Sequence, residues 1–147
     1  MEMIFEILVT IIFAAFLSAI AWTDFKTLMI YDKILIPMAT VGIFFDANNL
    51  LVPVEEGLLN SALIFLLMFL IFKISRGGLG GGDVKFSAVL GIWLGEKIFS
   101  AIFLASILAA VVAIIFLIKF RDIKKELPFA PFLSAGSFII YFMKFIV

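Results

Sequence analysis

The sequence predicts an all-α, polytopic membrane protein with about six transmembrane helices in a single domain, residues 1–147. Hydrophobic residues make up 65% of the chain and the mean hydropathy is +1.30, whereas soluble domains are about 45–50% apolar. Apolar runs alternate along the chain with short polar segments. A helix that crosses a bilayer needs about 20 residues, so each run, with its flanks, is a candidate span.

The apolar runs set the expected order of the helices. In chain order they cover residues 7–22, 34–45, 58–74, 84–95, 98–118 and 129–147. The second run is short, so its helix is expected to take in flanking residues. A tight turn is expected at Gly95–Lys97, between the fourth and fifth helices. The acidic start, Met1–Glu6, lacks a basic region and a small-residue cleavage site, which indicates a retained first helix.

Basic residues divide unevenly between the two sides that six spans would create. One side carries nine of the 11: Lys26, Lys33, Lys73, Arg76, Lys85, Lys119, Arg121, Lys124 and Lys125. The other side carries only Lys97 and Lys144. Cytoplasmic loops of membrane proteins are enriched in Lys and Arg. The nine-residue side is therefore expected to be cytoplasmic, with both termini on the non-cytoplasmic side.

Absent residue types exclude several kinds of site. The chain contains no cysteine and no histidine. This excludes a disulfide framework, a thiol nucleophile, a Ser-His triad and a zinc site built from Cys or His. Carboxylates, Lys or Tyr would have to carry any acid–base chemistry. We expect no metal, no cofactor and no nucleic-acid partner.

Three aspartates, Asp24, Asp32 and Asp83, fall at the predicted cytoplasmic edges of the spans. Ionisable groups near a bilayer are costly and usually face the interior of a helix bundle or a watery cavity. Two carboxylates brought close together cannot both ionise easily, so they share a proton. The ionised one can activate a water molecule while the protonated one polarises a peptide carbonyl, which is aspartic protease chemistry.

Glycines cluster directly before Asp83. The stretch Gly77–Lys85 lies between two apolar runs and is poorer in side chains than any other part of the chain. Glycine loses much backbone entropy on ordering, so a cluster of glycines beside a span calls for a reason. Close approach of another backbone would leave Asp83 at the floor of a cleft. A flexible turn is the alternative.

Three motifs resemble those of the type IV prepilin peptidases. Gly80-Gly81-Gly82-Asp83, followed by Val84-Lys85, resembles the family's GxGD signature. Asp24 is followed six residues later by Ile30, and Asp32 fills the last place of the first catalytic motif. Pro128-Phe129-Ala130-Pro131-Phe132-Leu133 resembles the Pro-Phe-Gly-Pro-Phe-Leu segment that opens the family's last helix. In this order the motifs extend over nearly the whole chain.

The resemblance implies an aspartyl endopeptidase of the cytoplasmic (inner) membrane, in contact with lipid. Such enzymes remove the basic leader of prepilin or pseudopilin precursors at the cytoplasmic face. The catalytic pair carries over to Asp24 and Asp83. The supporting motif residues are Gly80, Gly82, Asp32, Lys85, Pro128 and Pro131. Lys85 could hold substrate or tune the pair, or it could anchor its helix at the lipid headgroups.

Some residues depart from the family pattern. Tyr31 replaces the proline of the first motif, so Tyr31-Asp32 also resembles the Tyr-Asp pair of presenilin-type proteases. Asp32 is therefore a rival to Asp24, which we prefer because its spacing matches the prepilin family. Ala130 replaces a glycine. The chain has no Cys-x-x-Cys motif for an N-methyltransferase domain, so it is expected to be a peptidase-only form whose product is methylated by another protein.

Other functions remain as alternatives. An archaeal preflagellin-type peptidase would use the same mechanism. A small proton-coupled transporter could use the same aspartates as a relay, but it would predict acids near the midplane and symmetry between the two halves. A non-catalytic assembly subunit would leave the GxGD sequence unexplained. The oligomeric state is left open.

Overall fold

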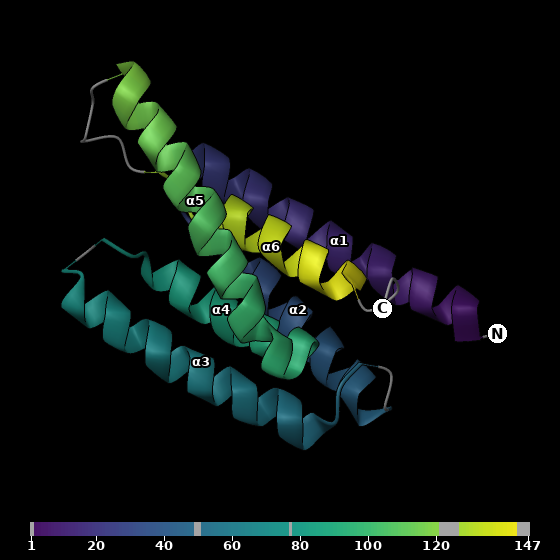
Figure 1. Cartoon of the computed structure of the whole chain (residues 1–147). Helices are drawn as coiled ribbons and strands as arrows, with labels where there is room; N and C mark the ends of the chain where they lie inside the picture. Colours follow the sequence, from purple (N-terminus) through teal and green to yellow (C-terminus); the bar gives the residue numbers. More distant parts are fainter. Residues whose placement is uncertain (1, 49–50, 77, 121–126, 144–147) are drawn as a thin grey trace.

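A computed structural model describes the chain except for residues 1, 49–50, 77, 121–126 and 144–147 (Figure 1). The described residues form α-helices and one short 3₁₀ helix and include no strand, which confirms the all-α prediction. In chain order the helices are α1 (Glu2–Thr27), α2 (Asp32–Ala47), α3 (Val54–Ile74), α4 (Gly81–Leu94), η1 (Gly95–Lys97), α5 (Ile98–Phe120) and α6 (Ala130–Met143).

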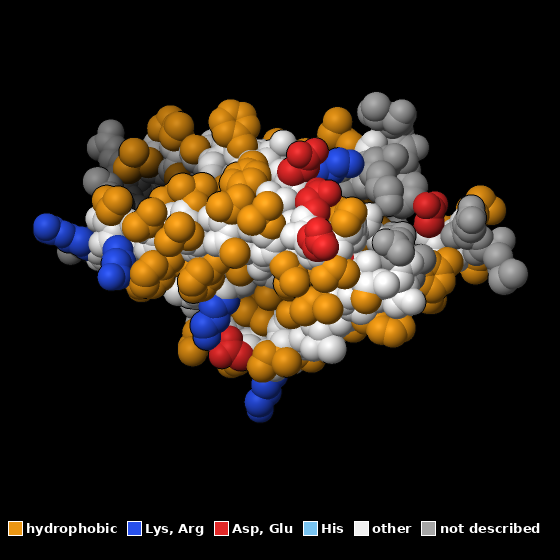
Figure 2. All heavy atoms as spheres, turned by 90° about the horizontal axis from the view of Figure 1, so that it is seen from below, with side chains coloured by type: hydrophobic (Ala, Val, Ile, Leu, Met, Phe, Trp, Pro, Cys, Tyr) orange, Lys and Arg blue, Asp and Glu red, His pale blue; other side chains and the backbone are white. Residues whose placement is uncertain are grey.

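Three helical stretches are long and apolar enough to cross a membrane: Met3–Thr27, Val54–Ile74 and Gly81–Lys119. Ala130–Met143 is a shorter apolar helix. Apolar side chains cover much of the surface, as Figure 2 shows for one face. These features are those of a membrane protein. The number of six spans and the placement of both termini stay predictions of the sequence.

Two helix boundaries differ from the expected ones in a way that matters for the site. The helix α1 continues past Trp22 to Thr27, and the hydroxyls of Thr23 and Thr27 donate hydrogen bonds to backbone carbonyls of the preceding turn. Asp24 is consequently held in the last helical turn. The helix α4 begins within the glycine cluster, at Gly81, so that Asp83 lies in its first turn, where the helix dipole favours an acid.

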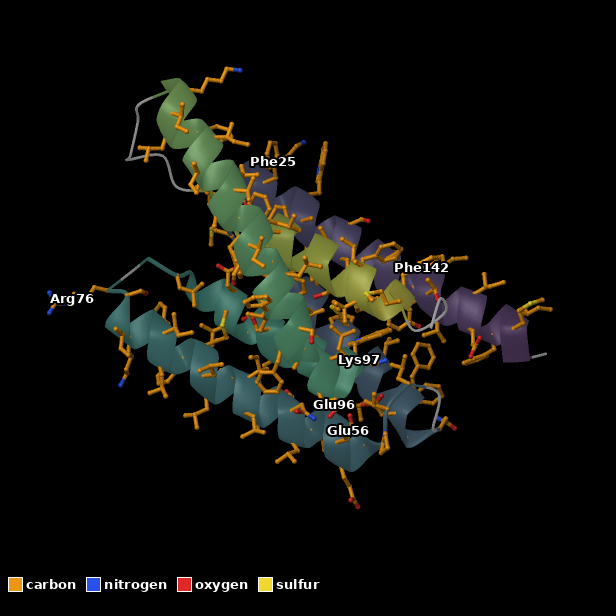
Figure 3. All side chains as sticks on the ribbon, in the orientation of Figure 1. Phe25, Glu56, Arg76, Glu96, Lys97 and Phe142 are labelled. Carbon is orange, nitrogen blue, oxygen red and sulfur yellow. The ribbon has the colours of Figure 1, made fainter. Side chains whose placement is uncertain are left out.

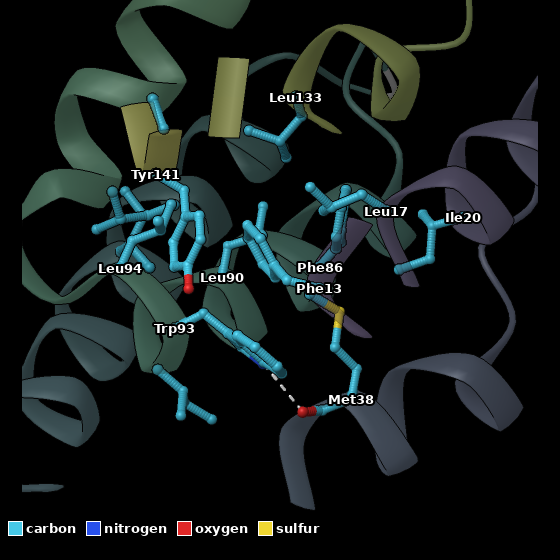
Figure 4. Close-up of a cluster of buried hydrophobic side chains, with 14 of the residues drawn as sticks. Phe13, Leu17, Ile20, Met38, Phe86, Leu90, Trp93, Leu94, Leu133 and Tyr141 are labelled. Carbon is cyan, nitrogen blue, oxygen red and sulfur yellow. Dashed lines mark hydrogen bonds between the residues drawn. The ribbon is translucent and has the colours of Figure 1, made fainter. Parts of the chain in front are cut away.

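The helices form two packed groups that meet along the middle of the molecule. In one, α4 packs against α3 and α2; in the other, α6 packs against α5 and α1 (Figure 1). An aromatic core joins the groups (Figure 4). Its centre is Trp93, which stacks on Phe13 at 4.8 Å between ring centroids and donates a hydrogen bond from Nε1 to the Met38 carbonyl at 3.0 Å.

The helix α5 packs closely along only half of its length. Near its start, Ala101 and Ala105 are buried, and a Cβ at Gly136 of α6 would lie 2.8 Å from the Ala101 carbonyl oxygen. Small residues here allow the close packing that the sequence predicts. Beyond this contact, none of the described residues 106–119 is buried. The second half of α5 therefore leaves space beside the ends of α1, α4 and α6.

Candidate active site

Asp24 and Asp83 lie together at one end of the bundle. Asp24 comes from the last turn of α1 and Asp83 from the first turn of α4, and their side chains are 6% and 8% exposed. Both line a cavity of about 480 Å³. Both also line a second, smaller cavity. The structure thus brings together the two carboxylates that the sequence pairs.

The cavity has walls from four parts of the chain. Besides the two aspartates, it is lined by Leu28, Gly78, Leu79, Gly80, Ala109, Ala110, Ala113, Leu127, Pro128, Phe129 and Phe132. The alanines come from the second half of α5, which does not pack closely against α6. The phenylalanines come from the start of α6 and give the cavity an apolar side. An extended apolar segment that enters the cavity would therefore meet both carboxylates beside an apolar wall.

The start of α6 contacts Asp24 directly. The backbone N–H of Ala130, the first residue of α6, donates a hydrogen bond to Asp24 Oδ2 at 3.1 Å. The N-terminus of a helix stabilises negative charge through its free N–H groups. Pro128 lines the cavity and Pro131 lies in the first turn of α6, where a proline is tolerated. The proline-rich motif thus forms a third part of the site.

Glycines of the cluster make room for the site. A Cβ at Gly80 would lie 3.0 Å from Asp83 Oδ2, and a Cβ at Gly82 would lie 3.0 Å from the Cβ of Ile30. The cluster therefore serves close approach and, from Gly81 onward, forms a helix instead of a flexible turn. The approaching groups are the Asp83 carboxylate and the Ile30 side chain, whereas we expected another backbone.

One oxygen of Asp83 has no partner. Oδ1 is buried and makes no hydrogen bond to any described residue. A buried carboxylate oxygen without a partner is costly unless it is protonated or bonded to a ligand. Asp83 therefore has the capacity for one more hydrogen bond within the site.

Asp32 lies outside this arrangement. Its side chain is 56% exposed and pairs with Lys85, whose Nζ is 3.0 Å from both carboxylate oxygens. It does not line the cavity that contains Asp24 and Asp83. Of the two aspartates that compete for the first position, the geometry therefore favours Asp24.

Sequence reasoning missed the contribution of the backbone. The Ala130 N–H carries no sequence signal, because every residue except proline has one. The sequence singles out Ile30 only by its spacing from Asp24, because the contact of Ile30 with Gly82 depends on tertiary packing. Within the described residues, no group of three or more Asp or Glu could hold a metal ion.

These features define a helical membrane protein with a buried aspartate pair at one end of its bundle. The chain belongs to the type IV leader peptidase family, which matches residues 11–118. This confirms the resemblance that the three motifs indicate.

Curated relatives agree with the family assignment. The chain is 36% identical over 141 residues to the prepilin leader peptidase/N-methyltransferase of Bacillus subtilis (strain 168), covering 92% of this chain and 56% of that protein. It is 31% identical to the protein of the same description from Xanthomonas campestris pv. campestris, covering 90% and 48%. The chain thus spans about half the length of these relatives. No solved structure matches the chain significantly.

Proposed function

We propose that the protein is a membrane-embedded aspartyl endopeptidase that removes the basic leader of type IV prepilin or pseudopilin precursors at the cytoplasmic face of the inner membrane. The observation that carries the proposal is the burial of Asp24, in the last turn of α1, and Asp83, in the first turn of α4, in one cavity. Membership in the type IV leader peptidase family supports the choice of substrate. The mechanism requires neither metal nor cofactor.

The two aspartates have different surroundings, which suggests a division of roles. Asp24 accepts a hydrogen bond from the Ala130 N–H at the N-terminus of α6, so Asp24 carries the negative charge and acts as the base. Asp83, with its unpartnered Oδ1, carries the proton and donates it to the carbonyl oxygen of the scissile peptide. The protonated Asp83 polarises the carbonyl, and this promotes attack by water.

Hydrolysis passes through a tetrahedral intermediate. Asp24 takes a proton from water while the water oxygen bonds to the carbonyl carbon. The Asp83 proton passes to the carbonyl oxygen, and a neutral diol results. The carbon–nitrogen bond then breaks. The leaving nitrogen takes the proton held by Asp24, and a diol proton returns to Asp83. The products are a free carboxylic acid and a free amine, and both aspartates are restored.

The surroundings of the cavity suit a precursor with a basic leader and an apolar helix. The helix can lie against the apolar surface of the bundle while the peptide bond after the leader reaches the aspartates. The predicted cytoplasmic side, rich in Lys and Arg, holds the ends of α1 and α4 from which both aspartates come.

Cleavage of a prepilin-like precursor by the purified full chain in liposomes tests the proposal. Asp24→Asn and Asp83→Asn keep the shape of the side chains and are expected to abolish cleavage, whereas Asp32→Asn keeps substantial activity. Thermal unfolding verifies that each variant is folded. Full cleavage by Asp83→Asn would refute the aspartyl mechanism. Failure of the wild-type chain on prepilin, pseudopilin and preflagellin precursors would refute the peptidase function, and proton flux would then test the transporter alternative.

A further inference from the structure

The ion pair between Asp32 and Lys85 joins two segments that each carry a candidate catalytic aspartate. Asp32 begins α2, eight positions after Asp24 in the sequence, and Lys85 lies in α4, two positions after Asp83. We propose that Asp32 and Lys85 are positioning residues that hold the 28–31 segment against the start of α4 and thereby fix Asp83 opposite Asp24. The inference rests on the proposed peptidase function.

The 28–31 segment leaves Asp24 by a sharp bend. The Leu28 N–H donates a hydrogen bond to the Asp24 carbonyl at 2.8 Å. Leu28 has a φ of 53°, a backbone angle that residues other than glycine rarely adopt. Surrounding contacts must hold such a conformation in place. The position of the end of α1, and with it Asp24, is therefore coupled to whatever holds this segment.

Two contacts hold the segment on α4, one inside and one outside. On the inside, Ile30 packs over Gly82, where a Cβ would be only 3.0 Å away. On the outside, Lys85 Nζ bonds both oxygens of Asp32 at 3.0 Å. Gly82 and Lys85 are three residues apart and so lie on one side of α4. Asp83 follows Gly82 and is turned about 100° round the helix, toward the cavity.

The exposed position of the Asp32–Lys85 pair favours a positioning role over a role in fold stability or in proton transfer. Both side chains are 56% exposed, so the pair contributes little to the stability of the fold. Neither Asp32 nor Lys85 lines the cavity, so neither is placed to exchange protons with a peptide there. The pair can fix the 28–31 segment relative to the start of α4. This matters because small displacements of catalytic groups have large effects on rate.

A double-mutant cycle tests the inference. The full chain in liposomes is compared as wild type, Asp32→Asn, Lys85→Met and the double variant, with Lys33→Met as a neighbouring exposed control. For cleavage of a precursor with a basic leader, each single variant is expected to lower kcat about threefold to tenfold, with KM nearly unchanged. The double variant should be no slower than the slower single variant. The control should stay within about twofold of wild type.

Other outcomes would overturn the inference. Single variants as fast as wild type, or losses that multiply in the double variant, would show that the residues do not act as a pair. A raised KM in Lys85→Met alone would mean that Lys85 binds substrate directly. Inactivity of the wild type is a separate result and contradicts the proposed function itself.

A second measurement does not depend on activity. The chain has no cysteine, so Ile30→Cys introduces a single thiol at the contact with Gly82. If the pair holds the 28–31 segment on α4, maleimide labelling of this thiol should become at least about threefold faster when Lys85→Met is added. Lys33→Met added to Ile30→Cys serves as the control. An unchanged labelling rate with Lys85→Met would contradict the inference even if cleavage were impaired.

Discussion

Both ends of the helix bundle bury aspartates, but they do so in different ways. At one end, Asp24 and Asp83 share a cavity of about 480 Å³. At the other, Asp46 is 2% exposed near the end of α2 and is tightly enclosed. Its Oδ1 accepts the Val52 N–H at 3.5 Å, and a Cβ at Gly57 would lie 2.7 Å from its Oδ2. Burial of an acid alone therefore does not indicate a catalytic site.

The two ends of the bundle differ in open space and in the surroundings of the neighbouring acid. Glu56 acts electrostatically on Asp46, and its Oε1 accepts a hydrogen bond from the Glu96 N–H at 3.4 Å; Figure 3 labels both glutamates. One bond joins the end of α2 to Val52, the other joins α3 to η1, and the cavity beside Glu56 measures only about 110 Å³. Asp83, in contrast, keeps an unpartnered oxygen beside an open cavity. The first arrangement is structural, and the second is suited to chemistry.

The largest expected effect concerns Asp24 and Asp83, the candidate catalytic pair. Asp24→Asn or Asp83→Asn should lower kcat for precursor cleavage by about 1,000-fold or more, because removal of the base or the acid leaves only binding effects. Asp46→Asn, an identical chemical change at an equally buried site, should stay within about threefold of wild type. Cleavage rates per folded molecule provide the measurement. A similar loss in Asp46→Asn would contradict the division between the two ends.

A second comparison uses one glycine from each end. Gly82→Val would press a branched side chain against Ile30 and displace the start of α4, so cleavage should fall by about 100-fold. Gly57→Ala would crowd the Asp46 carboxylate and should cost about 1–3 kcal/mol of stability. Its folded fraction should nevertheless keep nearly the wild-type kcat. Thermal unfolding and single-turnover cleavage separate the two effects, and a normal kcat in Gly82→Val would refute the role given to this contact.

The sequence predicted those parts of the molecule that depend on composition and local pattern. Long apolar runs, the turn at Gly95–Lys97 and the pairing of Asp24 with Asp83 could be recognised because hydropathy and motif spacing are properties of the chain itself. Gly95 has a φ of 56°, which explains why a glycine occupies this turn. Charge asymmetry also predicted an orientation in the membrane, which stays a prediction.

Parts of the site that depend on tertiary contacts could not be predicted. The Ala130 N–H reaches Asp24 across 106 positions of sequence, and the contact depends on how α6 packs against α1. The exposure of Asp32 and its pairing with Lys85 likewise became clear only from the fold. Tyr31 in place of the motif proline left Asp32 as a competitor of Asp24, although the spacing favoured Asp24. The fold places Asp24 in the cavity and leaves Asp32 exposed.

The smallest expected effect is the pH dependence of stability that comes from Asp46, near the end of α2. Burial raises the pKa of Asp46 from 3.8 to about 6, and the charge of Glu56 adds to this rise. Between these two values the folded protein binds more protons than the unfolded chain, so this group lowers the free energy of unfolding as pH rises from about 4 to about 6. Asp46→Asn cannot titrate and should remove this contribution. Thermal unfolding midpoints of wild type and Asp46→Asn, measured from pH 4 to pH 7.5, should therefore diverge as pH rises, with the variant the more stable at neutral pH. Parallel curves would show that Asp46 has the same pKa in the folded and unfolded states, and the surroundings of its carboxylate would then have to contain an additional compensating donor.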